Sequence, residues 1–469
     1  MTTPGEATIA AIATAEGAAG VACVRISGAD AWSVADRVLR FSGASLGSRQ
    51  AGTWLHAQVV EPQSGEIVDD AVVLLFRAPA SFTGEDAVEI QGHGGIVPPR
   101  RVLRAVLAAG SRLAEPGEFA RRAFLNGRID LTQAEAVMDL VNARTERAAQ
   151  AARAQLDGGL AREIDACYDR VVQLGADVAA RLDFEEGELP PRIREEERAA
   201  LAAIRAALAR LLATWHDGRL LRDGALVAIG GCPNSGKSSL LNALLGWKRA
   251  IVSATPGTTR DTIEEALILN GVALRLVDTA GLRDASCAVE REGVDRAHRA
   301  LSQADIVLYV VDASRPLADQ HPRLFAAVLA SDPKRAIVAL NKCDLQRVAS
   351  EAELSAWSSG WPAPDRPPVF PVSALTGEGT DALRAGLSDR LGLERHAPTQ
   401  VVVSERHRSE LAAADDALRH TAEFLNRDDA LVLASHSIQT AADALGRITG
   451  RVYSQDLLNG VFGRFCVGK

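Results

Sequence analysis

Several features are scarce in this sequence, and each scarcity excludes a class of protein. Aromatic residues make up 4% of the chain, which favours alanine-rich helical packing over β-sandwiches. The six cysteines are scattered and form no CxxC pair, so neither a disulfide framework nor a cysteine metal site is expected. No apolar run approaches about 18 residues, so no membrane span is expected. The formal net charge of −8 disfavours a generally basic nucleic-acid clamp.

The N-terminus also lacks the features of a secretion signal. It carries a glutamate and no basic stretch before its first apolar run, so we expect no signal peptide and a cytoplasmic protein. Two arginine-containing stretches, RVLRAVL from residue 101 and ARRAFLNGR from residue 120, leave a local basic surface open. The simpler interpretation, which we favour, is solvated arginines beside helices.

The pattern of apolar residues divides the 469-residue chain into an N-terminal domain, a helical domain and an inserted domain. Residues 1–127 combine Val-rich runs (21–28, 53–60 and 69–79) with turns and predict an α+β domain. Helical spacing begins near a T-x-x-E capping box at Thr132 and Glu135 and continues to residue 222. Residues 223–388 alternate short apolar runs with helical stretches, which predicts a mostly parallel, doubly wound sheet. Helical spacing returns in residues 389–469, so one discontinuous helical domain would carry the α/β domain as an insertion.

Within the α/β segment, GCPNSGKS at residues 231–238 follows an apolar run and precedes a helical run, as a phosphate-binding P-loop does. Its glycines let backbone amides face the phosphates. Lys237 supplies a catalytic cation for the β- and γ-phosphates, and Ser238 is a Mg²⁺ ligand. The expected nucleotide contacts of this loop are Asn234, Ser235, Gly236, Lys237, Ser238 and Ser239.

Two further motifs predict the remaining phosphate and Mg²⁺ contacts. In DTAG, Asp278 would hold Mg²⁺ through a water and the Gly281 amide would sense the γ-phosphate. In TPGTTRD, Thr259 is the expected second Mg²⁺ ligand. The other predicted GTP contacts in these motifs and just before them are Ser253, Thr258, Thr279 and Ala280.

The last two motifs predict that the base is guanine. In NKCD, Asp344 would accept hydrogen bonds from the N1–H and the 2-amino group of guanine. Adenine lacks these donors and would leave the carboxylate unpaired, which excludes ATP. Lys342 would lie over the base while Asn341 braces the loop. The SAL motif, with Ser373 and Ala374, would contact the guanine O6 through its backbone.

One expected residue is absent. Ras-like enzymes carry, directly after DxxG, a glutamine that positions the attacking water, and here that position is Leu282. An alkyl side chain cannot orient water. Either a partner supplies the missing group, or another cation and a carboxylate elsewhere in the chain replace it.

Over its whole length, the sequence resembles the tRNA-modification GTPase MnmE (TrmE) family. The resemblance rests on FTGEDAVEIQGHGG from Phe82, PGEFARRAFLNGRIDLTQAEAVMDL from Pro116, the GTPase motifs and the terminal CVGK. It implies that K⁺ stabilises the transition state where other GTPases use an arginine finger. The implied water-orienting carboxylate is Glu290, although Cys287 and Ala288 stand where more polar residues are usual. The implied K⁺ ligands are Asn234, Ser253, Thr255 and Thr258.

The resemblance also implies a site for a reduced folate, 5-formyl- or 5,10-methylene-tetrahydrofolate, at the dimer interface of the N-terminal domains. The implied folate ligands are Arg25, Glu89, Arg128 and Lys469. A carboxylate suits the donor edge of a pterin, and cations suit its anionic tail. Phe465 would then be packed and the carboxyl terminus ordered. Cys466 is a candidate for one-carbon chemistry, although we favour a small buried thiol.

The family function that the resemblance implies is modification of the wobble uridine of certain tRNAs. A homodimer would act with the flavoprotein MnmG, in a heterotetramer or larger complex, to install an aminomethyl or carboxymethylaminomethyl group at C5. Two alternatives stay open: a ribosome-assembly or signalling GTPase acting as an RNA-binding switch, and a folate-dependent methyl- or formyltransferase. The first would need a module such as a KH domain, whose GxxG loop Gly460–Gly463 matches only with an apolar centre.

Overall fold

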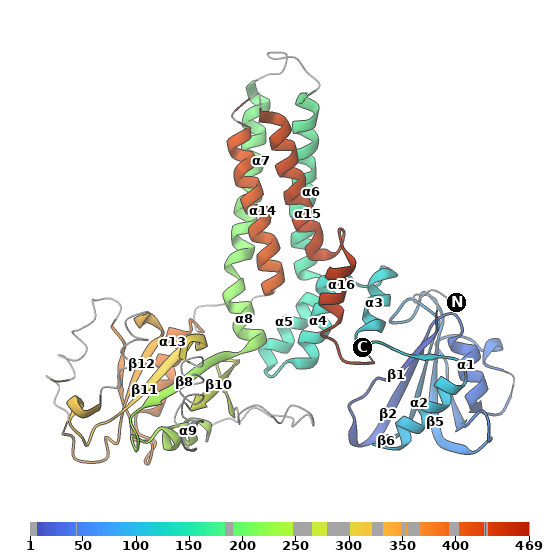
Figure 1. The fold of residues 1–469 in the computed structure, drawn as a ribbon, viewed down its shortest axis with the longest axis horizontal. Helices are drawn as coiled ribbons and strands as arrows, with labels where there is room; N and C mark the ends of the chain where they lie inside the picture. Colours follow the sequence, from blue (N-terminus) through green and yellow to red (C-terminus); the bar gives the residue numbers. More distant parts are fainter. Residues whose placement is uncertain are drawn as a thin grey trace, which may run out of the picture. The chain divides into compact units, whose positions relative to one another are not determined.

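A computed structural model of the chain is shown in Figure 1. It describes residues 7–43, 45–182, 191–246, 265–278, 301–320, 332–348, 353, 366–393, 403–425, 427 and 430–468. The chain divides into two compact units. The first unit comprises Met1–Met138, Leu156–Leu208 and Ser409–Lys469, and the second comprises Asp139–Gln155 and Ala209–Arg408. The chain therefore passes from the first unit to the second and back twice. The three domain boundaries expected from the sequence remain predictions.

The N-terminal part of the first unit is a seven-stranded sheet of order β3-β4-β5-β6-β2-β1-β7. Its strands are β1 (Ile9–Ile12), β2 (Gly17–Ser27), β3 (Leu39–Arg40), β4 (Trp54–Val60), β5 (Ile67–Phe76), β6 (Ala87–Gly95) and β7 (Arg112–Leu113). The three predicted strands are confirmed in β2, β4 and β5. Helices α1 (Ala31–Val38) and α2 (Pro98–Ala108) share one buried core with apolar side chains of β2, β4, β5 and β6. A short 3-10 helix, η1 (Leu46–Ser48), follows β3, and α3 (Glu118–Leu125) follows β7.

Helices form the rest of the first unit, and others of the same series, α5 and α8, belong to the second (Figure 1). They are α4 (Leu131–Asn142), α5 (Glu146–Leu156), α6 (Gly159–Leu182), α7 (Pro191–Ala213), α8 (Trp215–Asp223), α14 (Glu405–Phe424), α15 (Leu431–Thr449) and α16 (Gln455–Phe462). The predicted apolar stripes of α6 and α15 are buried, with Ile164 and Leu174 of α6 and Ile438 of α15 at most 2% exposed. The stripe predicted on α4 is only partly buried, because its last member, Val141, is 50% exposed. None of the described helices is both long and apolar enough to cross a membrane.

The predicted capping box of α4 is wrong by two residues. Asp130, not Thr132, caps the helix: its Oδ1 accepts from the Gln133 amide at 2.9 Å, and the Gln133 side chain accepts from the Asp130 amide at 3.0 Å. This is a reciprocal D-x-x-Q box. Thr132 is fully buried in the first turn and donates its hydroxyl to Asp130. The sequence holds two overlapping box patterns, and the burial of Thr132 selects the earlier one.

The second unit contains a six-stranded sheet of order β13-β12-β11-β8-β10-β9. Its strands are β8 (Ala225–Gly231), β9 (Glu265–Leu269), β10 (Val272–Asp278), β11 (Ile306–Asp312), β12 (Ala336–Asn341) and β13 (Val369–Pro371). All neighbours are parallel except β9 and β10, so the predicted doubly wound sheet is confirmed with one antiparallel edge. Helix α9 (Lys237–Leu245) and the 3-10 turns η2 (Leu317–Gln320) and η3 (Pro333–Arg335) lie between strands along the chain, and helix α13 (Thr380–Arg390) follows β13.

The hairpin that joins β9 to β10 was missed from the sequence. It turns at Asn270 and Gly271, with φ of 47° and 80°, the left-handed conformation for which Asn-Gly is favoured in two-residue turns. Arg147 of α5 donates to the Asn270 carbonyl at 2.8 Å, and its stem covers Gly271. This helix therefore belongs to the same unit as the sheet.

Candidate active site

The P-loop connects β8 to α9 at the carboxyl edge of the parallel strands. Asn234 (φ 64°) and Gly236 (φ 92°) both adopt the left-handed conformation, which turns the chain sharply into the helix. Lys237 is 6% exposed, and its Nζ donates to the carbonyls of Gly231 at 3.1 Å and Cys232 at 2.9 Å. The lysine is thus folded back over the loop, with its charge held where phosphates bind in P-loops. Ser238 and Ser239 are exposed in the first turn of α9.

Asn341, at the end of β12, connects three predicted motifs. Its Nδ2 donates to the Ser235 carbonyl in the P-loop at 2.8 Å, and its Oδ1 accepts from the Ala374 amide at 3.0 Å. A Cβ at Gly236 would lie 2.2 Å from the same Nδ2, so only glycine fits beneath this side chain. The bracing role predicted for Asn341 is thus supported by the geometry, and the brace reaches the P-loop as well as the SAL motif.

Lys342 and Asp344 are both held by partners. Lys342 has φ of 66°, and its Nζ lies 2.6 Å from Oδ2 of Asp312. The hydroxyl of Ser373 donates to Oδ1 of Asp344 at 2.6 Å and therefore orients the carboxylate that is predicted to read guanine. The sequence predicted only a backbone contact for this motif. Ser373 itself is fully buried, whereas Asp344 is exposed.

Asp312 at the end of β11 was missed from the sequence. Burial by itself raises the pKa of its carboxyl. The hydrogen bonds from Lys342 and Ser314 lower that pKa by a larger amount, so the net shift is downward. Gln320 fixes the backbone on both sides: its Oε1 accepts from the Asp312 amide and its Nε2 donates to the Asp312 carbonyl, each at 2.8 Å. An Asp at the end of an apolar strand was the available signal, but its partner, Lys342, directly follows the neighbouring strand β12.

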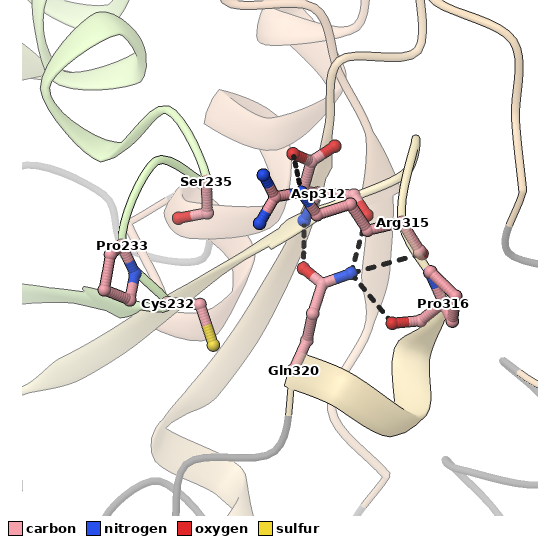
Figure 2. A pocket seen from close by; sticks show the side chains of 7 residues that line it. All are labelled: Cys232, Pro233, Ser235, Asp312, Arg315, Pro316 and Gln320. Atoms are coloured by element: carbon pink, nitrogen blue, oxygen red, sulfur yellow. Dashed lines mark hydrogen bonds and ion pairs between the residues drawn. The ribbon is translucent and has the colours of Figure 1, made fainter.

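Asp312 and Gln320 line a cavity of about 310 Å³ beside the P-loop. Figure 2 shows Gln320 reaching across one side to Asp312 while Cys232, Pro233 and Ser235 of the P-loop form the other. The Ser235 hydroxyl is buried and has no hydrogen-bond partner among the described residues. Asp278 ends β10, where its backbone aligns with Ile229 of β8, so this motif also begins at the same edge.

A second predicted site, in the first unit, centres on Arg25 and Glu89. The two residues face each other across β2 and β6, and Arg25 Nε donates to Glu89 Oε1 at 2.8 Å. The Arg25 guanidinium lies over the Phe82 ring at 5.4 Å from its centroid. The stem of Arg128 packs against Gly84 in the same FTGED turn. Burial, and then the Glu89 charge, raise the pKa of the neighbouring Cys23 thiol to about 12. Arg25 and Arg128 thus contact the FTGED turn, and Glu89 is paired with Arg25.

Buried charges hold that turn in place. Arg122 is 5% exposed and donates to both carboxylate oxygens of Glu85 at 3.1 Å and to Glu118 at 2.9 Å. Glu85 also accepts from the Ser27 hydroxyl at 2.7 Å. Arg112 pairs with Glu118 on its other side. Arg122 of the ARRAFLNGR stretch is therefore internal to the fold, so at this residue neither a basic surface nor a solvated arginine is found.

The carboxyl-terminal segment is docked on the same unit. Phe465 is 5% exposed and packs with α16, α3 and α4 in one apolar cluster, which confirms that it is packed. A Cβ on Gly117 would lie 2.4 Å from the Phe462 carbonyl, and one on Gly468 would lie 2.2 Å from the Ile12 carbonyl. Ile12 ends β1, beside the strand that carries Arg25. The tail is ordered through Gly468, but Cys466 is exposed, so the expected buried thiol is wrong.

Comparison with known families bears on both sites. The model of the MnmE helical domain matches residues 131–466, and the model of the GTP-binding protein TrmE N-terminus matches residues 8–128. The chain belongs to the MnmE family. It is 46% identical to a tRNA modification GTPase MnmE of Symbiobacterium thermophilum, over 99% of this chain and 100% of that one. The corresponding proteins of Chlorobium luteolum and Geobacter sulfurreducens are each 42% identical, over 98% and 99% of this chain and 97% and 99% of theirs.

Membership of the MnmE family makes this chain a GTPase and accounts for its interrupted helical unit, because the helical model extends across the inserted sheet. The GxxG match is not a KH loop: Val461 and Phe462 are buried within and at the end of α16 and cannot clamp a nucleic-acid backbone. Several predicted site residues fall outside the described residues. They are Ser253, Thr255, Thr258, Thr259, Thr279, Ala280, Gly281, Glu290 and Lys469, together with the switch positions Leu282, Cys287 and Ala288.

Proposed function

We propose that this chain is a K⁺-dependent GTPase that modifies C5 of the wobble uridine in certain tRNAs. It would act as a homodimer with the flavoprotein MnmG, use a reduced folate as the one-carbon donor, and use GTP hydrolysis to rearrange its domains. The observation that carries the proposal is the full-length family match, combined with a P-loop, NKCD and SAL motif that are tied together by Asn341.

The nucleotide half of the proposal assigns each motif a task. Lys237 faces the β- and γ-phosphates, Ser238 and Thr259 hold Mg²⁺ with Asp278 acting through a water, and Asp344 selects guanine. The Ser373 hydroxyl keeps the Asp344 carboxylate turned for that contact. Bound K⁺ would supply positive charge between the phosphates. Asn234 supports a K⁺ site because its left-handed backbone puts it at the turn of the P-loop, with Ser253, Thr255 and Thr258 as further ligands.

Hydrolysis also needs a group that orients water, and Leu282 cannot do so. We assign this role to Glu290, whose carboxylate can accept a hydrogen bond from the attacking water. Glu290→Ala should keep GTP affinity and slow hydrolysis by roughly 100- to 10,000-fold. Glu292→Ala, in the same segment, is the matched control and should hydrolyse GTP normally. Equal hydrolysis rates of Glu290→Ala and the wild type in KCl would refute the role of Glu290. Equal rates of the wild type in KCl and in NaCl would refute the role of K⁺.

The folate half rests on the exposed side of the N-terminal sheet. Arg25 and Glu89 are 22% and 18% exposed at the side chain, so both remain accessible after pairing. Glu89 would accept from the pterin, while Arg25, Arg128 and Lys469 would meet the anionic tail. Cys466 is an exposed residue of the docked tail, which keeps one-carbon chemistry there as part of the proposal.

A homodimer is supported by the same face. Trp54 and Val72 alternate with the core positions of β4 and β5 and are 69% and 39% exposed. Large apolar side chains gathered on an uncovered sheet face are typical of an interface. Glu89→Gln should weaken binding of 5-formyl-tetrahydrofolate by about 10-fold or more in calorimetry, whereas Glu61→Gln, at a turn of the same domain, should not. Unchanged affinity of Glu89→Gln would refute this site.

A further inference from the structure

The hairpin of β9 and β10 joins the two motifs that are predicted to contact Mg²⁺ and the γ-phosphate. Along the chain, β9 begins at Glu265, shortly after TPGTTRD, and β10 ends at Asp278, the first residue of DTAG. Strand β9 stands at the end of the strand order and, among the described strands, pairs only with β10. Because an edge strand has one neighbour, fewer hydrogen bonds oppose its movement than oppose that of a central strand.

The tip of this hairpin is held by α5 and α13. Arg147 of α5 donates from Nη1 to the Asn270 carbonyl at 2.8 Å. A Cβ at Gly271 would lie 2.3 Å from Arg147 Cδ, so the stem of the arginine packs directly against the turn. The Asn270 side chain donates to the hydroxyl of Ser388 in α13 at 2.7 Å, and Ser388 is 1% exposed. The turn is therefore anchored to two helices by named contacts.

The body of the hairpin shares an apolar core with α5. Ala151 of α5 is buried in the same cluster as Leu267 of β9 and Leu274 of β10. Leu220 of α8 belongs to this cluster as well. Protein interiors are close-packed, so the hairpin cannot shift without moving its neighbours or opening a void. A displacement of the two strands is therefore also a displacement of α5.

Helix α5 is connected to the first unit at both of its ends. The chain enters the second unit at Asp139, inside α4, and returns to the first at Leu156. Only the short connection 143–145 separates α4 from α5. The first turns of α4 are fixed within the first unit, because Leu131 and Ala134 are buried in the cluster that contains Phe465 of the docked tail. A movement of α5 is therefore passed to α4 along the chain.

We propose that the contact between Arg147 and the Asn270-Gly271 turn couples the nucleotide state to α5 and, through α5, to α4. The inference rests on the proposed function, which uses GTP hydrolysis to rearrange the domains, and it identifies where that rearrangement starts. A ligand shifts a conformation only by binding its two states differently. The γ-phosphate meets this condition, because it is present before hydrolysis and absent afterwards. GTP holds both ends of the hairpin and tightens its tip against Arg147, a positioning residue, whereas GDP leaves the hairpin looser.

The test is amide hydrogen exchange of the full-length protein, with GDP or with a non-hydrolysable GTP analogue, in the presence of Mg²⁺ and KCl. In the wild type, residues 146–156 should exchange about 2- to 12-fold more slowly with the analogue, the range that one hydrogen bond supplies. Arg147→Met keeps much of the stem and should reduce this difference, and Arg147→Ala should abolish it. Because coupling is reciprocal, the affinity for the analogue relative to GDP should fall by the same factor. Gln150→Ala is the matched control: Gln150 is exposed on α5 and bonds to Glu146 of the same helix.

Each contrary result has a distinct meaning. Equal exchange of residues 146–156 with GDP and with the analogue in the wild type would overturn the coupling and leave the proposed GTPase standing. A wild-type difference retained in Arg147→Ala, or an equal loss in Gln150→Ala, would overturn the role of this contact. If Arg147→Ala does not fold, Arg147→Met decides by the same criterion. The measurement uses neither tRNA nor folate, so a failure of the tRNA part of the proposed function would leave its result unchanged.

Discussion

The sharpest prediction concerns Asp312→Asn, a substitution of nearly equal size at the end of β11. The carboxylate is 3% exposed and lies 2.6 Å from Lys342 Nζ, while its Oδ1 accepts from the Ser314 hydroxyl at 2.6 Å and the Ser314 amide at 3.0 Å. Asparagine offers one acceptor oxygen and no charge. Either Lys342 or Ser314 then faces an NH₂ group, and the lysine that should cover the guanine base is released.

The size of the effect follows from this geometry. A hydrogen bond between charged groups contributes about 1.5–3 kcal/mol, but Lys342 is 30% exposed and solvent screens part of it. We expect a loss of about 1–2 kcal/mol, or roughly 5- to 30-fold in the Kd of GDP. The turnover of bound GTP should change little, since the pair lies at the base and not at the γ-phosphate.

The assay is displacement of a fluorescent guanine nucleotide from the full chain, together with single-turnover hydrolysis. Asp305→Asn is the matched control, because Asp305 directly precedes the same strand and forms an equally close pair with Arg219 at the opposite edge. It should lower thermal stability and leave the nucleotide Kd unchanged. A folded Asp312→Asn variant with wild-type Kd, or with the same Kd change as Asp305→Asn, would refute the reasoning.

Three other predictions follow from single contacts. Gly236→Ala should weaken nucleotide binding by about 2–3 kcal/mol, because a Cβ at φ 92° is strained and meets Asn341 at 2.2 Å; equilibrium dialysis showing wild-type affinity would contradict this. Phe465→Ala should expose the tail, with amide exchange of residues 463–468 faster by about 100-fold for a loss near 3 kcal/mol; unchanged protection would show that Phe465 does not dock it. Burial raises the pKa of Glu118, but Arg112 and Arg122 lower it on balance. The stability contributed by the ionised Glu118 is therefore fully present above its unfolded-state pKa, and it is lost as the pH falls through its folded-state pKa. Glu118→Gln should cost about 3 kcal/mol at neutral pH and progressively less in acid, and a pH-independent difference in urea unfolding would reject that cause.

The strands of the second unit were predictable because parallel strands covered on both faces are continuous apolar runs. Residues 225–231 are such a run and coincide with β8. The order of motifs then located the nucleotide edge, because parallel strands end at the same side of a sheet. The β9–β10 hairpin was missed although Asn270-Gly271 was a usable local signal.

Pairings between distant segments could not be predicted from the residues alone. Asp312 and Lys342 come together through the register of β11 and β12, and Arg25 meets Glu89 through the register of β2 and β6. Register depends on packing across the sheet and not on either strand by itself. The capping error has a similar origin: Asp130 and Thr132 both suit a helix start, and tertiary burial of Thr132 decides between them.

The carboxyl terminus, FCVGK, shows the same limit. An apolar run before the end of a chain is compatible with a frayed tail. The docking becomes evident only when Gly117 and Gly468 are seen to have no room for a Cβ against carbonyls of Phe462 and Ile12. Both glycines have positive φ, at 68° and 99°. Close backbone contact therefore explains these two residues, which the sequence pattern left unexplained.

Mass spectrometry of tRNA nucleosides tests the central claim most directly. A bacterial strain lacking its own MnmE gene would be complemented with the wild-type chain, with Lys237→Ala, or with a chain ending at Phe465. The account predicts that the C5-substituted wobble uridine is lost in the deletion strain, returns with the wild type, and fails to return with Lys237→Ala or the shortened chain. Wobble uridines that do not change on deletion, or full restoration by Lys237→Ala, would contradict it.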